Sequence, residues 1–427
     1  MISGRNARKK ASWIALVALG TALVSAIGVN AAAPDVPLPQ AAYAAVSDPV
    51  GGIRFSDPDP VAPGVTYRTF QLTTSHGSAS GHLVSVDLRN PKVSLELLHP
   101  DAVAKKERIS QMVGRQGAVA GVNGDFFNVS ETHAGVAPTN SAVGPEISGS
   151  ESLKFAVPNK QRFGPKLPDG TSTRNVFGLG VDGRARVSSL ALDGELKTKD
   201  GRITINGLNQ YALPEGGIGV YTRDWGTASR VRPTCGSDTS RSAPCSGETM
   251  EVTVRDGVVA SVYSKPGAGA IPDDTVVLVG REQGAAILGQ LQPGDKLKVD
   301  YRLVAEDHPR FLFAVGGFPI LRDGQPLAGM DDPALAPRTS AGVSADGKQV
   351  YLAVVDGRIA ASVGMTVSEL AALMQSFGAV DAVNLDGGGS STLVTRQSEA
   401  PAATVRNAPS DGSERAVANG IGVFVRD

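Results

Sequence analysis

Cysteine, histidine and aromatic residues are scarce in this chain of 427 residues, and neither sign of charge is in excess. The 41 lysines and arginines against 42 aspartates and glutamates give no basic bias, which argues against a nucleic-acid partner. The five histidines are scattered, without the spacing of a zinc site. Only two tryptophans are present, so a binding module that stacks sugars on exposed rings is disfavoured.

The two cysteines, Cys235 and Cys245, lie close together in a segment rich in serine, glycine and proline. In an exported protein, such a pair oxidises to a local disulfide. A thiol nucleophile is the alternative, but no histidine lies near either cysteine in the sequence. We therefore predict a disulfide between Cys235 and Cys245.

The N-terminal residues follow the order of a secretory signal peptide. Four basic residues within the first ten precede an apolar segment over 13–29, and small residues then continue to Ala44. We expect 1–44 to be a signal peptide and the mature chain to be secreted. An uncleaved membrane anchor is the alternative, because the apolar run is just long enough to span a bilayer. No second run of spanning length follows, so we expect no stable membrane insertion of the mature chain.

Glycine and proline are abundant, with 51 and 27 residues, and favour short strands joined by tight turns. Residues 45–64 are rich in Pro, Asp and Gly without periodicity and are predicted to be a linker, so the folded domain is expected over 65–427. Within it, Asp-Gly pairs between alternating apolar residues are typical of hairpin turns, in which the aspartate forms the turn and is not a catalyst. These pairs begin at Asp182, Asp193, Asp200, Asp256, Asp323, Asp346 and Asp356. The prediction is an α+β fold, mainly antiparallel β-sheet with few helices.

Two segments have clear helix signals. In residues 366–377, Thr366 can cap the N-terminus while Glu369 reaches back to it, and Gly378 stops the helix. A second segment, 109–116, stops at Gly117. Each helix leads into a short apolar strand.

The two helix-strand units share the pattern GAVxxVNxD, at 117–125 and at 378–386. Coincidence is the alternative in a chain so rich in Gly, Ala and Val. Residues two apart fall on one face of a strand. Two related units would therefore place four polar residues around one cleft, namely Asn123, Asp125, Asn384 and Asp386. The glycines at 387–389 would allow a ligand to approach the backbone closely.

Four segments together resemble the phosphodiester glycosidase family. They are GVNGDFF at 121–127, RTSAGVSADGKQVYLAVVDGR at 338–358, NLDGGGSSTLV at 384–394 and RAVANGIGVFV at 415–425. The resemblance covers about 65–427 and implies a fold of that family and hydrolysis of a glycosidic bond to phosphate. The substrate class it implies is a sugar phosphodiester, either like N-acetylglucosamine-1-phosphodiester or within a cell-wall or exopolysaccharide glycan. A glycosidase acting on a linkage without phosphate is the alternative.

Cleavage at an anomeric carbon needs a carboxylate beside the sugar ring, and a phosphate leaving group needs cations. We expect Asp386 to be the nucleophile or ring-stabilising carboxylate and Asp125 to be its partner in acid-base catalysis or water activation. The reverse assignment of the two aspartates is the alternative. Arg338 is the first choice for the phosphate and Arg415 the second, with a structural ion pair as the alternative for Arg338. The remaining substrate-binding candidates are Asn123, Asn384, Gly387, Gly388, Gly389, Ser390 and Ser391. No cofactor is expected, although the density of Asp and Asn is compatible with an oxygen-ligated Ca²⁺.

Overall fold

The computed structural model describes residues 51–306, 309–330, 333–396 and 402–426. Residues Asp48–Asp427 cluster as one unit. The predicted signal peptide over 1–44 lies outside the described residues. Among the described residues, no helix has the length and apolar character needed to cross a membrane.

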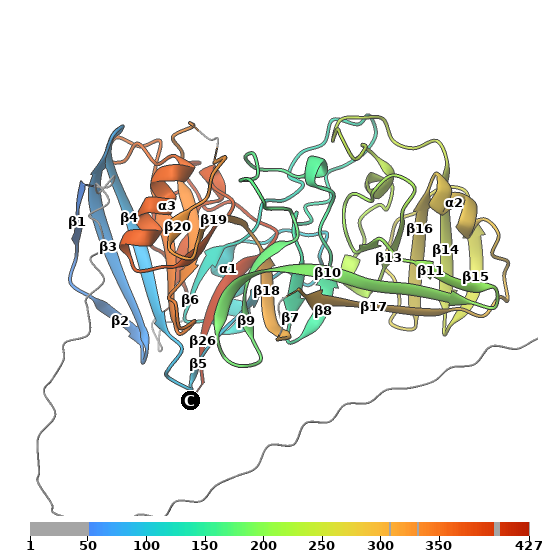
Figure 1. The fold of residues 1–427 in the computed structure, drawn as a ribbon, viewed down its shortest axis with the longest axis horizontal. Helices are drawn as coiled ribbons and strands as arrows, with labels where there is room; N and C mark the ends of the chain where they lie inside the picture. The colour runs from blue at the N-terminus through green and yellow to red at the C-terminus, as the bar shows by residue number, and fades with distance from the viewer. Residues whose placement is uncertain (1–50, 307–308, 331–332, 397–401, 427) are drawn as a thin grey trace, which may run out of the picture. The chain divides into compact units, whose positions relative to one another are not determined.

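Antiparallel sheets dominate the described residues, which confirms the predicted fold class (Figure 1). The largest sheet has nine strands in the order β1-β3-β4-β22-β21-β23-β19-β20, with β2 also paired to β3. Its strands are β1 (Gly51–Phe55), β2 (Asp59–Ala62), β3 (Val65–Thr74), β4 (Gly77–Asp87), β19 (Phe318–Arg322), β20 (Gln325–Pro326), β21 (Arg338–Val343), β22 (Gln349–Val355) and β23 (Asp381–Asn384).

Strands β1 and β2 fall inside the segment 45–64 that the sequence indicates as a linker, so the sheet begins earlier than expected. Both strands pair antiparallel with β3. They are short, and β2 contains Pro60, as is common where a strand lies at the edge of a sheet. Such strands lack the alternating pattern that identifies a strand in a sequence.

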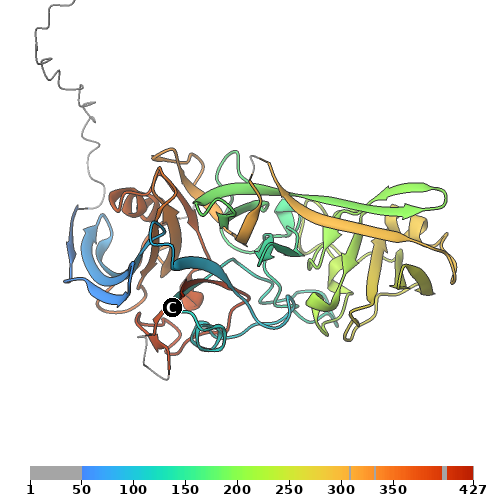
Figure 2. The ribbon, with the colours of Figure 1, turned by 90° about the horizontal axis from the view of Figure 1, so that it is seen from below.

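A second sheet has seven strands and a third has five. The second contains β7 (Glu146–Ser148), β8 (Glu151–Lys154), β9 (Asn175–Gly180), β10 (Ala185–Thr198), β11 (Gly201–Thr204), β17 (Lys298–Ala305) and β18 (Phe311–Gly316). The third contains β12 (Gly207–Leu208), β13 (Ile218–Tyr221), β14 (Thr249–Arg255), β15 (Val258–Tyr263) and β16 (Thr275–Arg281). The long strands β10 and β17 pair side by side and run toward the third sheet (Figure 2).

The fourth sheet has the order β25-β24-β6-β26-β5 and contains the first of the two repeated units. Its strands are β5 (Val93–Leu98), β6 (Ala120–Asn123), β24 (Leu393–Thr395), β25 (Thr404–Val405) and β26 (Gly420–Val425). Strand β6 lies between β24 and β26, and all four of its residues are buried.

Five of the seven predicted Asp-Gly turns connect paired strands. At Asp256 and Asp323, both the aspartate and the following glycine have positive φ, which the favoured two-residue hairpin turn requires. Two of the predictions are wrong. Asp193 lies inside β10, and Asp356 follows β22 as a buried residue whose carboxylate contacts His82 Nε2 at 3.1 Å.

The two predicted helices are present as α1 (Ile109–Gln116) and α3 (Val367–Ser376). In α3 the side chain of Thr366 accepts from the Glu369 amide at 3.2 Å, and Glu369 accepts from the Thr366 amide at 2.9 Å. Gly117 and Gly378 have φ of 81° and 95°, the left-handed conformation that ends each helix. A third helix, α2 (Gln283–Leu288), escaped prediction because it has only six residues and no side-chain cap. Short 3₁₀ turns are η1 (Asn159–Gln161), η2 (Arg223–Trp225), η3 (Arg232–Thr234) and η4 (Gly388–Ser390).

Helices α1 and α3 each pack on the sheet that contains the strand after them. Helix α3 buries Leu370, Leu373 and Met374 in a cluster with Phe70 and Ile320 of the nine-stranded sheet. Helix α1 buries its own apolar face in a cluster with residues of the fourth sheet. Full burial of one such side chain stabilises the fold by about 1.5–3 kcal/mol. This packing fixes where β6 and β23 end.

Candidate active site

The two repeated units meet at the C-terminal ends of β6 and β23. The backbone amide of Asp386 donates to the carbonyl of Gly124 at 2.9 Å. The side-chain amide of Asn123 donates to the carbonyl of Asp386 at 2.7 Å. The two strands belong to different sheets, so these bonds join the sheets at this point. The structure therefore has the convergence of strand ends that the repeat predicts.

An open cleft of about 320 Å³ lies at this junction. It is lined by Phe126, Ala334, Ala336, Arg338, Arg358, Asp386, Gly387, Gly388, Gly389 and Arg415. Three arginines thus face one cleft with one carboxylate. Two larger hollows, of about 580 and 590 Å³, lie elsewhere on the described residues, and neither gathers the motif residues.

Asp386 is half-buried in the cleft, and its Oδ1 accepts from the Gly387 amide at 3.0 Å. Burial raises the pKa of Asp386 to about 7, and the negative charge of Asp125 raises it further. Hydrogen bonds from Ser390 and Gly387 and the charge of Arg415 act in the opposite direction. A carboxyl group with this pKa exists in both protonation states near neutral pH, as is common for acids and bases in active sites.

The glycine run allows close packing around this carboxylate. Gly388 has φ of 60°, a conformation that other residues adopt rarely. A Cβ on Gly389 would lie 2.2 Å from the guanidinium of Arg415 and from the carboxylate of Asp411. Glycine at 389 is therefore required for Arg415 to approach the loop.

Arg338 and Arg415 line the cleft, as the sequence predicts, but both also bond to protein groups. Arg338 is buried, with Nε donating to the carbonyl of Met365 at 2.8 Å and a terminal nitrogen donating to that of Ala334 at 2.6 Å. Arg415 pairs with Asp411 through Nε at 2.9 Å. These bonds fix the orientation of each guanidinium at the rim of the cleft.

Arg358 is the third arginine of the cleft, and the sequence reasoning missed it. It is exposed, it has φ of 61°, and within the described part of the chain it forms no ion pair. A Cβ on Gly388 would lie 3.3 Å from its guanidinium, so Arg358 lies directly over the glycine run. The available signal was its place as the last residue of the motif segment 338–358.

Asp125 lies behind the cleft, and the expectation that it faces the substrate is not met. It is 1% exposed and does not line the cleft. Its Oδ2 accepts from the Gly144 amide at 2.5 Å. Burial raises the pKa of Asp125 to about 7; the Gly144 hydrogen bond and the charge of Lys154 oppose this, whereas the charge of Glu146 adds to it.

Glu146 and Lys154 complete a buried charged group with Asp125, and neither belongs to a motif that would single it out in the sequence. Lys154 donates to the carbonyl of Gly144 at 2.6 Å, and its burial lowers its pKa to about 8. Glu146 accepts from the side-chain amide of Asn419 at 2.8 Å, and burial raises its pKa. Nothing in their local sequence distinguishes these residues from ordinary surface charges.

The predicted polar substrate-binding residues have different positions. Asn123 is fully buried and bonds to protein groups. Asn384 is also buried, but its side-chain oxygen and nitrogen have no hydrogen-bond partner among the described residues. Ser390 bonds to Asp386 and accepts from Arg415 at 3.4 Å. Ser391 is buried and does not line the cleft.

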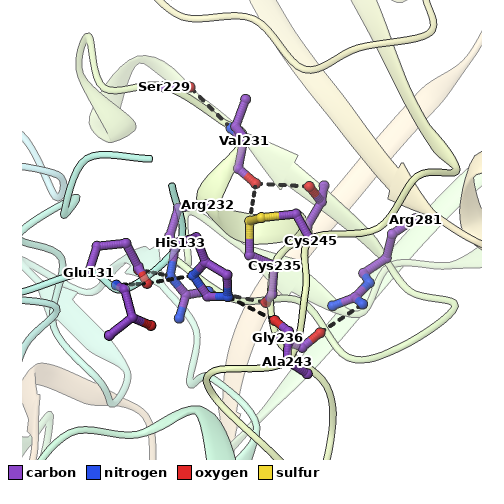
Figure 3. The surroundings of a disulfide bond; sticks show 12 residues. Glu131, His133, Ser229, Val231, Arg232, Cys235, Gly236, Ala243, Cys245 and Arg281 are labelled. Atoms are coloured by element: carbon purple, nitrogen blue, oxygen red, sulfur yellow. Dashed lines mark hydrogen bonds and ion pairs between the residues drawn. A yellow bond between two sulfur atoms is a disulfide. The ribbon is translucent and has the colours of Figure 1, made fainter. Parts of the chain in front are cut away.

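The predicted disulfide between Cys235 and Cys245 is confirmed (Figure 3). His133 lies beside it, with Nε2 at 2.8 Å from the carbonyl of Ala243 and Nδ1 at 2.5 Å from Glu131. His133 and the two sulfurs lie within 4.8 Å of one another. The disulfide engages both sulfurs, so in this state the three residues do not form a zinc site.

Part of this chain is similar to a known protein family. Residues 248–424 match the family model for phosphodiester glycosidase. The SPbeta prophage-derived uncharacterized protein YomE of Bacillus subtilis (strain 168) is 31% identical over 188 residues. This match covers 42% of the present chain and 26% of YomE, so the chain spans about a quarter of that relative's length.

Two crystal structures show the same fold. A putative exported protein from Burkholderia pseudomallei superposes with a TM-score of 0.68 at 21% identity, covering 88% of this chain and 97% of its own. A hypothetical protein from Synechocystis superposes with a TM-score of 0.67 at 23% identity, covering 86% of this chain and 63% of its own. At these identities the likeness shows the fold alone.

Proposed function

From the premise that residues 248–424 match the phosphodiester glycosidase family, we propose that this protein hydrolyses the glycosidic bond to phosphate in a sugar phosphodiester. The observation that carries the proposal is the convergence of Arg338, Arg358 and Arg415 on the cleft that holds Asp386. Guanidinium groups bind phosphate oxygens through paired, charge-assisted hydrogen bonds. An uncharged glycoside has no anionic group that three guanidinium groups could bind.

The proposed chemistry takes place at the anomeric carbon. The bond from this carbon to the phosphate oxygen breaks, and its electron pair leaves with the phosphate. A water oxygen bonds to the carbon in its place, and the proton that this water loses passes to the released phosphate or to solvent. Asp386, when ionised, would act as the nucleophile or would stabilise the positive charge that develops on the ring. The arginines would hold the phosphate and neutralise the charge it gains, so the departing group needs little help from a strong acid.

For Asp125 we propose a supporting role. It is buried behind the cleft, so its carboxylate is not placed to activate a water molecule at the sugar. Its charge raises the pKa of Asp386, and its neighbour Asn123 holds the Asp386 backbone. Asp125 would thus adjust the protonation of Asp386 without contacting the substrate.

We also propose that the protein acts outside the cell on a carbohydrate or sugar-phosphate substrate. The order of residues at the N-terminus and the disulfide support export. A mature N-terminus near Ala45 on secreted protein is the expected result of N-terminal sequencing. Secreted protein that still begins at Met1 would contradict export with cleavage.

The decisive assay compares glycosyl phosphodiesters with simple aryl glycosides of the same sugars. We expect turnover of the phosphodiesters by the secreted protein and loss of turnover by orders of magnitude in Asp386→Asn, which removes the charge but little volume. Asp200→Asn is the matched control, because Asp200 is an exposed turn residue outside the cleft. Activity on aryl glycosides alone would instead favour a glycosidase acting on linkages without phosphate, and absence of both activities would contradict the proposal.

A further inference from the structure

Asp356 is a buried carboxylate two residues before Arg358, and the proposed reaction does not use it. It is 6% exposed and does not line the cleft. Its Oδ2 lies 3.1 Å from Nε2 of His82, and its Oδ1 accepts from the backbone amide of Ala408 at 2.9 Å. The two oxygens are therefore bonded to two parts of the chain that are far apart in the sequence.

The nine-stranded sheet holds this carboxylate from one side. His82 lies on β4 and Tyr67 on the neighbouring strand β3, and both residues are buried. The Tyr67 hydroxyl lies 2.7 Å from Nδ1 of His82. Because a carboxylate only accepts hydrogen bonds, the ring proton belongs on Nε2, facing Asp356, and Nδ1 accepts from Tyr67. The imidazole thus has a partner on each nitrogen and a fixed orientation.

The backbone around Arg358 is also held at both ends. The Asp356 amide donates to the carbonyl of Ser80 at 2.9 Å, and the Asp356 carbonyl accepts from the hydroxyl of Ser362 at 2.6 Å. Ser362 and Ile359 exchange backbone hydrogen bonds of 3.1 and 3.2 Å, which close the turn after Arg358. The exposed guanidinium of Arg358 therefore extends from a backbone of fixed position.

The bond to Ala408 extends this arrangement to a second arginine. Ala408 precedes a turn over 409–412, which a backbone hydrogen bond of 2.9 Å closes. Asp411 lies in this turn and accepts from Nε of Arg415 at 2.9 Å. The carboxylate of Asp356 thus connects the turn that orients Arg415 to the backbone that carries the other exposed arginine of the cleft.

We propose that Asp356, held by His82 and Tyr67, is a positioning residue that keeps Arg358 and Arg415 arranged to bind one phosphate group. Paired hydrogen bonds from guanidinium to phosphate are directional. An arginine side chain has many rotamers, so a fixed backbone narrows the positions that its guanidinium can reach. This inference rests on the proposed function, and it assigns the buried carboxylate to the phosphate half of the site.

The test is a double-mutant cycle between Asp356 and Arg358. Asp356→Ala alone should raise the KM for a glycosyl phosphodiester by roughly tenfold, with a smaller change in kcat, because contacts to the phosphate are weakened. In the Arg358→Ala background the same change should raise KM by a clearly smaller factor, since one of the two positioned arginines is already absent. Asp356→Asn keeps an acceptor for the Ala408 amide and should have an intermediate effect. The KM for uncharged aryl glycosides should not change in any of these variants.

Glu251→Gln is the matched control for Asp356→Asn. Glu251 is another buried carboxylate, it pairs with Arg230 at 2.8 and 2.9 Å, and it does not line the cleft. Its effect on KM should be the same with and without Arg358. Equal factors for Asp356→Ala in the two backgrounds would overturn the inference, as would an unchanged KM. If Asp356→Ala does not fold, Asp356→Asn completes the same cycle.

Absence of glycosyl phosphodiester hydrolysis by the wild-type protein would count against the proposed function, and the positioning role then has a separate measurement. Calorimetry with inorganic phosphate compares the wild type, Asp356→Ala, Arg358→Ala and the double variant. An affinity that falls in Asp356→Ala, and falls by a smaller factor when Arg358 is already replaced, supports the inference. Equal affinities in all four proteins, or no phosphate binding by the wild type, would overturn it.

Discussion

The side-chain amide of Asn123 donates a 2.7 Å hydrogen bond to the backbone carbonyl of Asp386. A residue of the first repeated unit thereby holds the proposed nucleophile, which belongs to the second. The side-chain oxygen of Asn123 also accepts from the hydroxyl of Thr339 at 2.7 Å and from the amide of Thr392 at 3.0 Å. Asn123, Thr339 and Thr392 are fully buried, so the two threonine groups have no water to bond to if Asn123 is lost.

Asn123→Ala is therefore expected to lower the free energy of unfolding by about 3 kcal/mol, since several buried polar groups lose their partner. Activity should fall as well, because the backbone of Asp386 is released. Chemical denaturation and turnover on a glycosyl phosphodiester measure the two effects. Asn90→Ala is the control, since Asn90 bonds at the surface. A variant as stable and as active as the wild type would show that the bond between the two units is unimportant.

The protonation of Asp386 predicts the pH dependence of the reaction. Burial raises the pKa of this carboxyl to about 7, and an ionised nucleophile is lost as the pH falls below that value. We expect kcat/KM to decrease on the acid side of neutrality, roughly tenfold per pH unit well below the pKa. A value of kcat/KM that decreases on the basic side instead would indicate that Asp386 acts as a proton donor.

Asp125→Asn should move this acid limb to lower pH. The negative charge of Asp125 is one of the causes that raise the pKa of Asp386, and its removal makes ionisation of Asp386 easier. The midpoint of the kcat/KM profile measures the shift, and Asp256→Asn, at an exposed turn, is the control. An unchanged midpoint with reduced kcat would mean that Asp125 acts through structure alone.

The local signals in the sequence were sufficient for the elements that local chemistry determines. The cap at Thr366 and the left-handed glycines at 117 and 378 depend on neighbouring residues, and all are present as predicted. Asp356 shows the limit of such reasoning. Its sequence context is that of a hairpin turn, but its partner His82 lies on another strand far away in the chain.

In the candidate site, too, the sequence identifies the features that depend on local motifs but not those that depend on distant residues. The motif around Asp386 identified the glycine run, and the segments 338–358 and 415–425 each gave one of the three arginines of the cleft. Periodicity gave the face of the strand on which Asp125 lies, but not what covers that face. A Cβ on Gly316 would lie 2.2 Å from the Asp125 carboxylate, and Gly144 bonds to it, so two distant glycines enclose the group. That enclosure follows from tertiary packing, which the local pattern does not contain.

The disulfide should stabilise the protein without taking part in the chemistry. Closing a loop with a sequence separation of 10 restricts the unfolded chain, so Cys235→Ser with Cys245→Ser should lower the free energy of unfolding by about 3 kcal/mol. Chemical denaturation measures this, and thiol titration of the unfolded, unreduced wild type should find no free thiol. Two titratable thiols would contradict the bond.

Arg358 gives the cleanest test of the phosphate site, because the fold does not depend on it. Within the described residues it has no ion-pair partner, it is exposed, and it lies over Gly388 in the cleft. Arg358→Ala should therefore change the free energy of unfolding by no more than about 0.5 kcal/mol, as is usual for surface substitutions. The KM for glycosyl phosphodiesters should rise, because one charge-assisted contact to the phosphate is lost, and Arg358→Lys should recover only part of it, since lysine lacks the planar fork. Arg202→Ala, an exposed arginine outside the cleft, is the control. An equal loss of activity on uncharged aryl glycosides would mean that Arg358 supports the site in general and does not bind the phosphate.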